Sequence, residues 1–145
     1  MNIDFLDSVT NSDKGVEFEI KNPKNGQGTH IFFTIKGGDS KAYSEALKLA
    51  MKNATKETTI DDVNCAVVIS TTMGFSAEEQ DADKDGKPAF DKDGNPVYKN
   101  VPLMLDGKEL RFSEATLRDL FKIAPTIPAQ LAIHQKERGD FLKMP

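Results

Sequence analysis

The chain has 145 residues, of which 38% are hydrophobic and 29% are charged, and its formal net charge is -4. This length suits a single domain with one continuous core. With 19 basic against 23 acidic residues, the charge balance argues against a protein that binds the phosphate backbone of nucleic acids. Because Cys65 is the one cysteine, no internal disulfide can form, and we interpret it as a small thiol in a reducing compartment.

The first residues of the sequence, MNIDFLD, are acidic and lack the lysine-flanked apolar run of a signal peptide. No stretch approaches the roughly 20 apolar residues that a membrane-spanning helix needs. We therefore expect a protein that works in a cytoplasm and has no membrane partner.

Two runs with alternating apolar and polar residues predict a β-hairpin. Residues 16–20 and 29–36 each repeat with a period of two, which puts one apolar face on each strand. The intervening residues 21–28, KNPKNGQG, are turn formers that can reverse the chain. The sequence therefore predicts a hairpin with one apolar face.

Two helices are expected next. Asp39 or Ser40 can cap the first, and Thr59 can cap the second, which we expect to run from about Ile60 to Thr72. The β-branched residues at 67–72 leave a buried strand open as an alternative for the end of the second helix. Residues at helical spacing in the first helix are Tyr43, Ala46, Leu47, Ala50, Met51 and Ala54.

A short internal repeat follows, with DKDGKPAF at residues 83–90 and DKDGNPVY at residues 91–98. Each copy carries an Asp-Gly turn, a proline and an aromatic residue. We expect residues 76–100 to form a flexible acidic arm, or a turn-rich insertion such as a short ribbon, without a core of its own. Residues 76–95 carry seven acidic and three basic side chains, so the rest of the chain is formally neutral. We also expect deletion of residues 76–95 to leave the fold intact.

The last part of the sequence predicts a second hairpin and two more helices. Residues 101–105 and 108–112 flank an Asp-Gly turn, Ser113 can cap a helix that Pro125 ends, and a final helix should begin near Pro128. We therefore expect one α+β domain over residues 1–145, with two β-hairpins packed with about four helices and an acidic arm.

Residues 81–92 partly match a calcium-binding loop. Acidic side chains occupy its first, third and fifth positions and Gly86 its sixth, but the twelfth position is Lys92 instead of the bidentate glutamate. We therefore favour a solvated acidic turn over a calcium site.

No set of catalytic or metal-binding residues emerges from the sequence. His30 and His134 lack ligand spacing, and no serine or cysteine lies in a nucleophile motif. We therefore expect neither an enzyme nor a bound cofactor or metal.

Two blocks of sequence resemble the tail assembly chaperones of long-tailed bacteriophages. The first is GTHIFFTI at residues 28–35 followed by DSKAY at 39–43. The second is DGKELRFSE at 106–114, continued by a leucine-phenylalanine pair, a proline-broken helix and GDFL at 139–142. The chain departs from the family at residues 73–75, where a tryptophan is common.

The resemblance implies a non-enzymatic protein of the infected bacterial cytoplasm, absent from the mature virion. It would bind the long tape measure protein and help tail tube subunits to gather around it. The alternative is a structural tail component, such as a tube or tail-end protein, that stays in the virion. The sequence leaves open whether the chain forms a homo-oligomer.

A chaperone for a long helical client needs weak, repeated apolar contacts. The candidate residues for these contacts lie on the two last helices and just beyond them. The alternative for the helical ones is that they simply build the core. The candidate partner-binding residues are Leu117, Phe121, Ile127, Leu131, Phe141 and Leu142.

Overall fold

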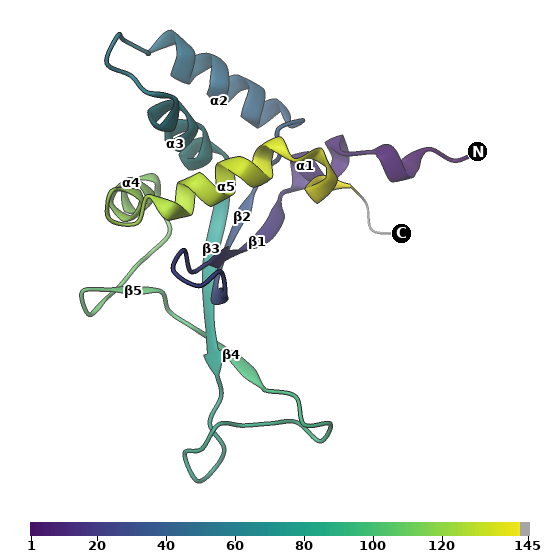
Figure 1. The fold of residues 1–145 in the computed structure, drawn as a ribbon, viewed down its shortest axis with the longest axis vertical. Helices are drawn as coiled ribbons and strands as arrows, with labels where there is room; N and C mark the ends of the chain where they lie inside the picture. Colours follow the sequence, from purple (N-terminus) through teal and green to yellow (C-terminus); the bar gives the residue numbers. More distant parts are fainter. Residues whose placement is uncertain (143–145) are drawn as a thin grey trace.

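A four-stranded antiparallel sheet in the order β1-β2-β3-β4 lies under a layer of helices (Figure 1). The coordinates are a computed structural model that describes residues 1–142, so residues 143–145 of the tail lie outside the described part. A small second sheet pairs two further strands. The strands are β1 Val16–Lys21, β2 Gly28–Ile35, β3 Thr72–Gln80, β4 Tyr98–Val101, β5 Met104–Leu105 and β6 Lys108–Glu109.

Five α-helices and two short 3-10 helices complete residues 1–142, which form a single α+β domain. This confirms the expected fold class. In that part of the chain, no helix combines the length and the apolar character needed to cross a membrane. The helices are η1 Asp4–Leu6, α1 Val9–Lys14, α2 Lys41–Lys52, α3 Ile60–Thr71, α4 Glu114–Ile123, α5 Thr126–Lys136 and η2 Arg138–Phe141.

Local signals located the α2 and α3 helix starts correctly. The Ser40 hydroxyl accepts a hydrogen bond from the Tyr43 N–H, which caps α2. Thr59 and Asp62 form a reciprocal capping box at the start of α3. The open alternative of a strand from residue 67 is wrong, because α3 continues to Thr71 and β3 begins only at Thr72.

The boundaries expected for the acidic arm were wrong. Residues 76–80 belong to β3 and pair with β4, from Ala77 opposite Val101 to Gln80 opposite Tyr98. In this stretch only Ala77 is fully buried, so the hydrophobic pattern of a strand is faint there. Backbone pairing with β2 and β4 defines the strand instead, and the acidic arm therefore comprises residues 81–97.

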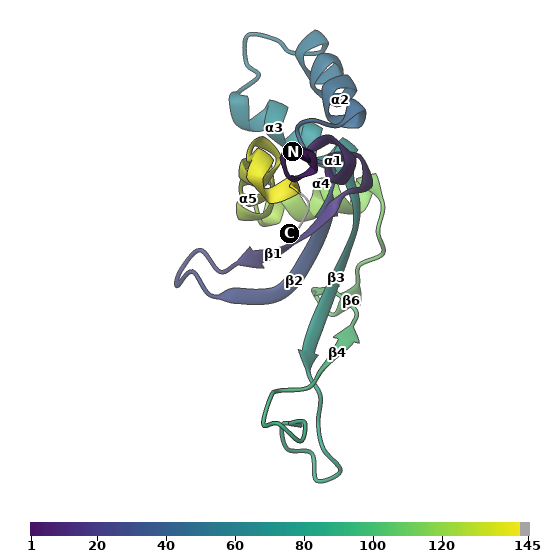
Figure 2. The same ribbon diagram turned by 90° about the vertical axis from the view of Figure 1, so that its right-hand side faces the viewer.

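The acidic arm extends away from the body beyond the end of β3 (Figures 1 and 2). The Asp83 carboxylate accepts hydrogen bonds from the N–H groups of Asp85 and Lys87, at 2.9 and 3.0 Å. The Asp91 carboxylate does the same eight residues later with Asp93 and Asn95, both at 2.9 Å. The sequence repeat is thus a structural repeat of one aspartate-anchored turn.

The core lies between the sheet and helices α3, α4 and α5. Phe33 and Ile35 of β2, Val68 of α3, Leu117 of α4 and Leu131 of α5 are all fully buried. Phe33 meets Phe75 edge to face, with ring centroids 5.7 Å apart, which extends the aromatic packing along the sheet. The apolar faces predicted for the first hairpin and the last two helices therefore meet in one core.

Gln135 joins three parts of the chain at the end of α5. Its side-chain amide, 2% exposed, donates to the Lys36 carbonyl at 3.0 Å and to the Thr71 hydroxyl at 2.5 Å. The backbone carbonyl of Gln135 accepts a hydrogen bond from the Gly38 N–H at 2.8 Å. A Cβ on Gly38 would lie only 2.5 Å from that carbonyl, so this position requires glycine. These bonds fix α5 to the ends of β2 and α3.

Asp39 holds the start of α1 against the C-terminal turn η2. It accepts a hydrogen bond from the Ser8 hydroxyl at 2.5 Å and from the Arg138 guanidinium at 2.9 Å. The Ser8 hydrogen bond, together with the charge of Arg138, lowers the pKa of this carboxyl despite its partial burial. The short α1, which has no apolar stripe for sequence analysis to detect, is anchored in this way.

The acidic arm should be dispensable for folding. We expect a variant in which Asn-Gly replaces residues 82–96 to unfold cooperatively, because the Asp81 N–H already pairs with the Val97 carbonyl at 2.7 Å. Differential scanning calorimetry should show a Tm within about 4 °C of the parent, which corresponds to about 1 kcal/mol in a domain of this size. Deletion of residues 76–95, in contrast, removes half of β3 and should lower the Tm much further. Equal Tm values for the two deletions would contradict this boundary.

Gln135 should contribute more to stability than a glutamine with equally short bonds at the surface. We expect Gln135→Met to lower the free energy of unfolding by about 1–3 kcal/mol, because the buried Thr71 hydroxyl and the partly buried Lys36 carbonyl lose their donor. The matched control is Gln130→Met, which removes two 2.8 Å bonds to the exposed Lys21 backbone and a 3.0 Å bond to the Thr126 hydroxyl, and it should cost less than about 1 kcal/mol. Urea denaturation with unchanged m-values measures both, and an equal loss in the two variants would refute the assignment.

Candidate partner-binding groove

The candidate partner-binding residues from the sequence are almost all buried. Leu117 and Leu131 are 0% exposed and Phe141 is 1% exposed. Phe121 and Ile127 are also buried, and Leu142 is partly buried. The prediction of a free apolar surface is therefore wrong for all of these residues except Leu142. The five buried side chains build the core between the helices and the sheet. Of the six, Phe121 alone also reaches the floor of a groove.

That groove lies between α3, α4 and α5 and has a volume of about 760 Å³. Its apolar lining comes from all three helices. Ile133 of α5 is 64% exposed, so the groove presents apolar surface to solvent. The main apolar side chains are Cys65, Ile69, Phe121, Ala129, Ala132 and Ile133.

Charged residues surround this apolar floor. Arg118 pairs with Glu114 at 2.8 Å along α4, and Asp62 is engaged in the capping box of α3. Lys136 donates to the Asn64 side chain at 3.3 Å. Within residues 1–142, neither Lys122 nor Lys136 has a carboxylate partner and Asp61 has no cationic partner, so the rim carries unpaired charges of both signs.

Cys65 lies half-buried in this groove. Burial raises the pKa of its thiol, and the negative charge of Asp62 raises it further. The thiol therefore stays protonated at neutral pH, which suits an apolar contact surface and not a nucleophile.

Sequence analysis missed the groove because its residues share no local pattern. The candidate residues that the sequence indicated on this helix were Ile127 and Leu131, which face the core. Ala129 and Ile133 of the same helix face the groove. The available signal was that α5 carries apolar residues on more than one side, which indicates a second contact surface.

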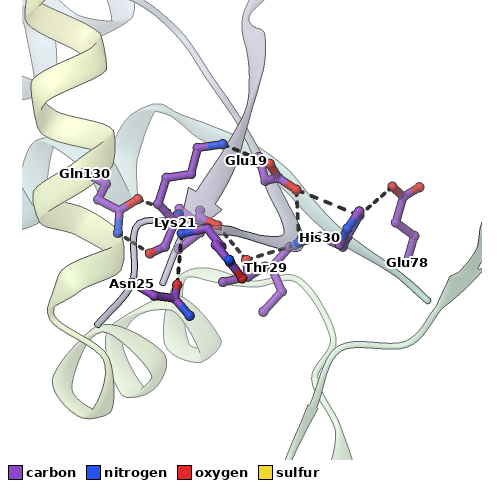
Figure 3. Close-up of polar contacts among 10 residues, drawn as sticks. Glu19, Lys21, Asn25, Thr29, His30, Glu78 and Gln130 are labelled. Atoms are coloured by element: carbon purple, nitrogen blue, oxygen red, sulfur yellow. Dashed lines mark hydrogen bonds and ion pairs between the residues drawn. The ribbon is translucent and has the colours of Figure 1, made fainter. Parts of the chain in front are cut away.

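A polar cluster closes the bend of the first hairpin (Figure 3). His30 has a left-handed backbone with φ of 59°, and its N–H donates to the Glu19 carboxylate at 3.1 Å. Its ring lies 3.2 Å from the Glu78 carboxylate and stacks on Tyr98 with centroids 4.5 Å apart. The cluster thus ties the hairpin to β3 and β4.

Glu19 is the central carboxylate of this cluster. Burial acts to raise its pKa, but hydrogen bonds from the Lys21 ammonium and from the His30 N–H outweigh that effect and lower it. The Gln130 amide meanwhile bonds both the N–H and the carbonyl of Lys21 at the edge of the sheet. These contacts hold the hairpin in shape, and the geometry assembles no nucleophile with them.

The acidic arm also falls short of the calcium loop considered from the sequence. Its Asp83 and Asp91 carboxylates point into their own turns, where they accept backbone hydrogen bonds. In the described part of the chain, no three histidine, cysteine or acidic side chains gather in a way that could hold a metal ion.

Comparison with known proteins gives no relative: no family model, no curated protein and no solved structure matches the chain. The groove and its chemistry are therefore the features on which a functional proposal can rest.

Proposed function

We propose that this chain is a bacteriophage tail assembly chaperone that binds the tape measure protein and assists assembly of the tail tube without catalysing a reaction. The observation that carries the proposal is the solvent-exposed apolar groove between α3, α4 and α5. It would work in the cytoplasm of the infected host.

The groove has the chemistry needed for a helical client. A long amphipathic helix offers an apolar stripe flanked by charged residues, and such a stripe docks into an apolar groove with a charged rim. The floor side chains Ile69, Phe121 and Ile133 would receive the stripe. Because only a few apolar side chains take part, each contact is weak, and arriving tube subunits can displace it.

The motifs that resemble the chaperone family coincide with whole elements of the fold. GTHIFFTI spans β2, DSKAY leads into α2, and DGKELRFSE runs from the β5-β6 turn to the start of α4. In that turn Asp106 and Gly107 both have positive φ values, as an Asp-Gly hairpin requires. The resemblance thus rests on structurally defined segments, which supports the proposal.

A single charge in the groove should weaken client binding. We expect Ile133→Asp to weaken binding at least tenfold, because it puts a carboxylate on the apolar floor. The matched control is Ile123→Asp on α4, which is 61% exposed and lies outside the groove. The probe is the client that the proposal names, a tape measure protein, co-expressed in fragments and measured by co-purification and titration calorimetry. Equal binding by both variants would reject the groove as the client site.

The protein composition of purified virions distinguishes a chaperone from the alternative, a structural tail component. The structural role is favoured by β4, an edge strand that pairs with β3 on one side. Its other side has no partner strand within residues 1–142 and is available for strand addition. We expect quantitative mass spectrometry to find the chain in infected cells and not in purified virions. If virions contain the chain in stoichiometric amounts, the chaperone proposal is wrong and the structural role takes its place.

A further inference from the structure

Residues 137–142, which we call the strap, are attached to the body of the domain by side chains alone. The backbone hydrogen bonds of the strap are local: the Asp140 N–H donates to the Glu137 carbonyl at 3.0 Å, and the Leu142 N–H donates to the Gly139 carbonyl at 3.4 Å. The Glu137 N–H donates to the end of α5. Among the described residues, no backbone hydrogen bond joins the strap to α1, to α3 or to the sheet.

Phe141 is the only fully buried side chain of the strap. Its ring meets Phe18 of β1 edge to face, with ring centroids 5.6 Å apart. A Cβ on Gly37 would lie only 2.8 Å from the same ring, so Phe141 packs directly on the backbone of that glycine. The attachment of the strap therefore depends mainly on one aromatic side chain.

The polar ties of the strap are open to solvent. Arg138 donates to the Asp39 carboxylate at 2.9 Å, but the Arg138 side chain is 78% exposed. The His134 ring lies 2.7 Å from the Asp140 carboxylate, and both side chains are more than a third exposed. Ion pairs that water can reach contribute little to stability. These ties orient the strap and do not lock it.

A buried hydroxyl without a partner lies beside the Phe141 ring. Ser12 of α1 is 1% exposed, and its Oγ has no hydrogen-bond partner among residues 1–142. A Cβ on Gly37 would lie 2.3 Å from this Oγ, so the hydroxyl and the Phe141 ring border the same point. An unpartnered polar group loses its hydration on burial, which costs free energy. The closed strap carries this cost, and an open strap would relieve it.

We propose that the strap opens by local unfolding while the sheet and helices α3, α4 and α5 stay folded. Segments with few attachments open at a lower free energy than the core. Glu137, with φ of -92° and ψ of 96°, lies outside the helical conformation and marks where the strap leaves α5. Because Gln135 is bonded to Lys36 and Thr71, α5 stays in place when the strap leaves. Opening exposes Phe141 and returns the Ser12 hydroxyl to water.

Chemical exchange saturation transfer on the amide nitrogens of the full chain measures this opening directly. We expect a minor state in which the amides of residues 138–142 have the chemical shifts of an unfolded chain. In the same minor state, the amides of Lys36 and Gly38 should keep their native shifts, because their hydrogen bonds join β2, α3 and α5 and do not involve the strap.

Ser12→Ala provides the decisive test, because it should close the strap more firmly by removing a side-chain group. We expect it to lower the open population at least about fivefold, since the closed state no longer buries an unpartnered hydroxyl. The matched control is Val9→Ala, which also replaces a residue of α1 by the best helix former but is 52% exposed. Val9→Ala should leave the open population as in the parent.

Arg138→Gln tests the exposed tie and should raise the open population by less than about fivefold. The proposal is overturned if no minor state appears, or if the shifts of Lys36 and Gly38 change together with those of the strap. Equal open populations in Ser12→Ala and Val9→Ala would overturn it as well. Because the measurement uses the chain alone and does not involve the groove, the chaperone function is judged separately, by client binding.

Discussion

The seating of α5 on the sheet is the constraint on which the rest of the fold depends. Through Gln135 the helix holds the end of β2 and the end of α3, and through its backbone it holds the loop that enters α2. Buried amide hydrogen bonds have direction, whereas apolar packing alone would let the helix slide. The core side chain Leu131 is positioned by the same attachment, and so is the angle at which α3 and α5 form the groove.

The position of α5 also explains why the buried and exposed apolar residues of its last turns differ so sharply. Leu131 faces the sheet and is completely buried, while Ile133, two residues later, faces solvent. In a helix two residues are separated by about 200° around the axis, so the two side chains lie on nearly opposite faces. The face of α5 that carries Leu131 packs in the core, and the face that carries Ile133 is left exposed within residues 1–142.

The parts of this fold that could be predicted from the sequence are those determined locally. The caps at Ser40 and Thr59 and the Asp106-Gly107 turn depend on a few adjacent residues, and each forms as expected. Strand β3 and the burial of Phe141 depend on residues far along the chain, namely β2 and β4 for the strand and Phe18 for Phe141, and both were missed. The groove was missed for the same reason, because it joins three helices from two distant parts of the sequence.

An apolar floor left exposed in this way has a physical cost, since it favours aggregation. The surrounding charges on Asp61, Glu114, Arg118 and Lys136 limit that cost by making unselective apolar contacts unfavourable at the rim. Folding does not depend on an apolar side chain at position 133 as it does at Leu131, because Ile133 is 64% exposed and lies outside the buried core cluster. In the proposed function, this exposed isoleucine would contribute to binding, with the apolar floor supplying affinity and the charged rim supplying selectivity.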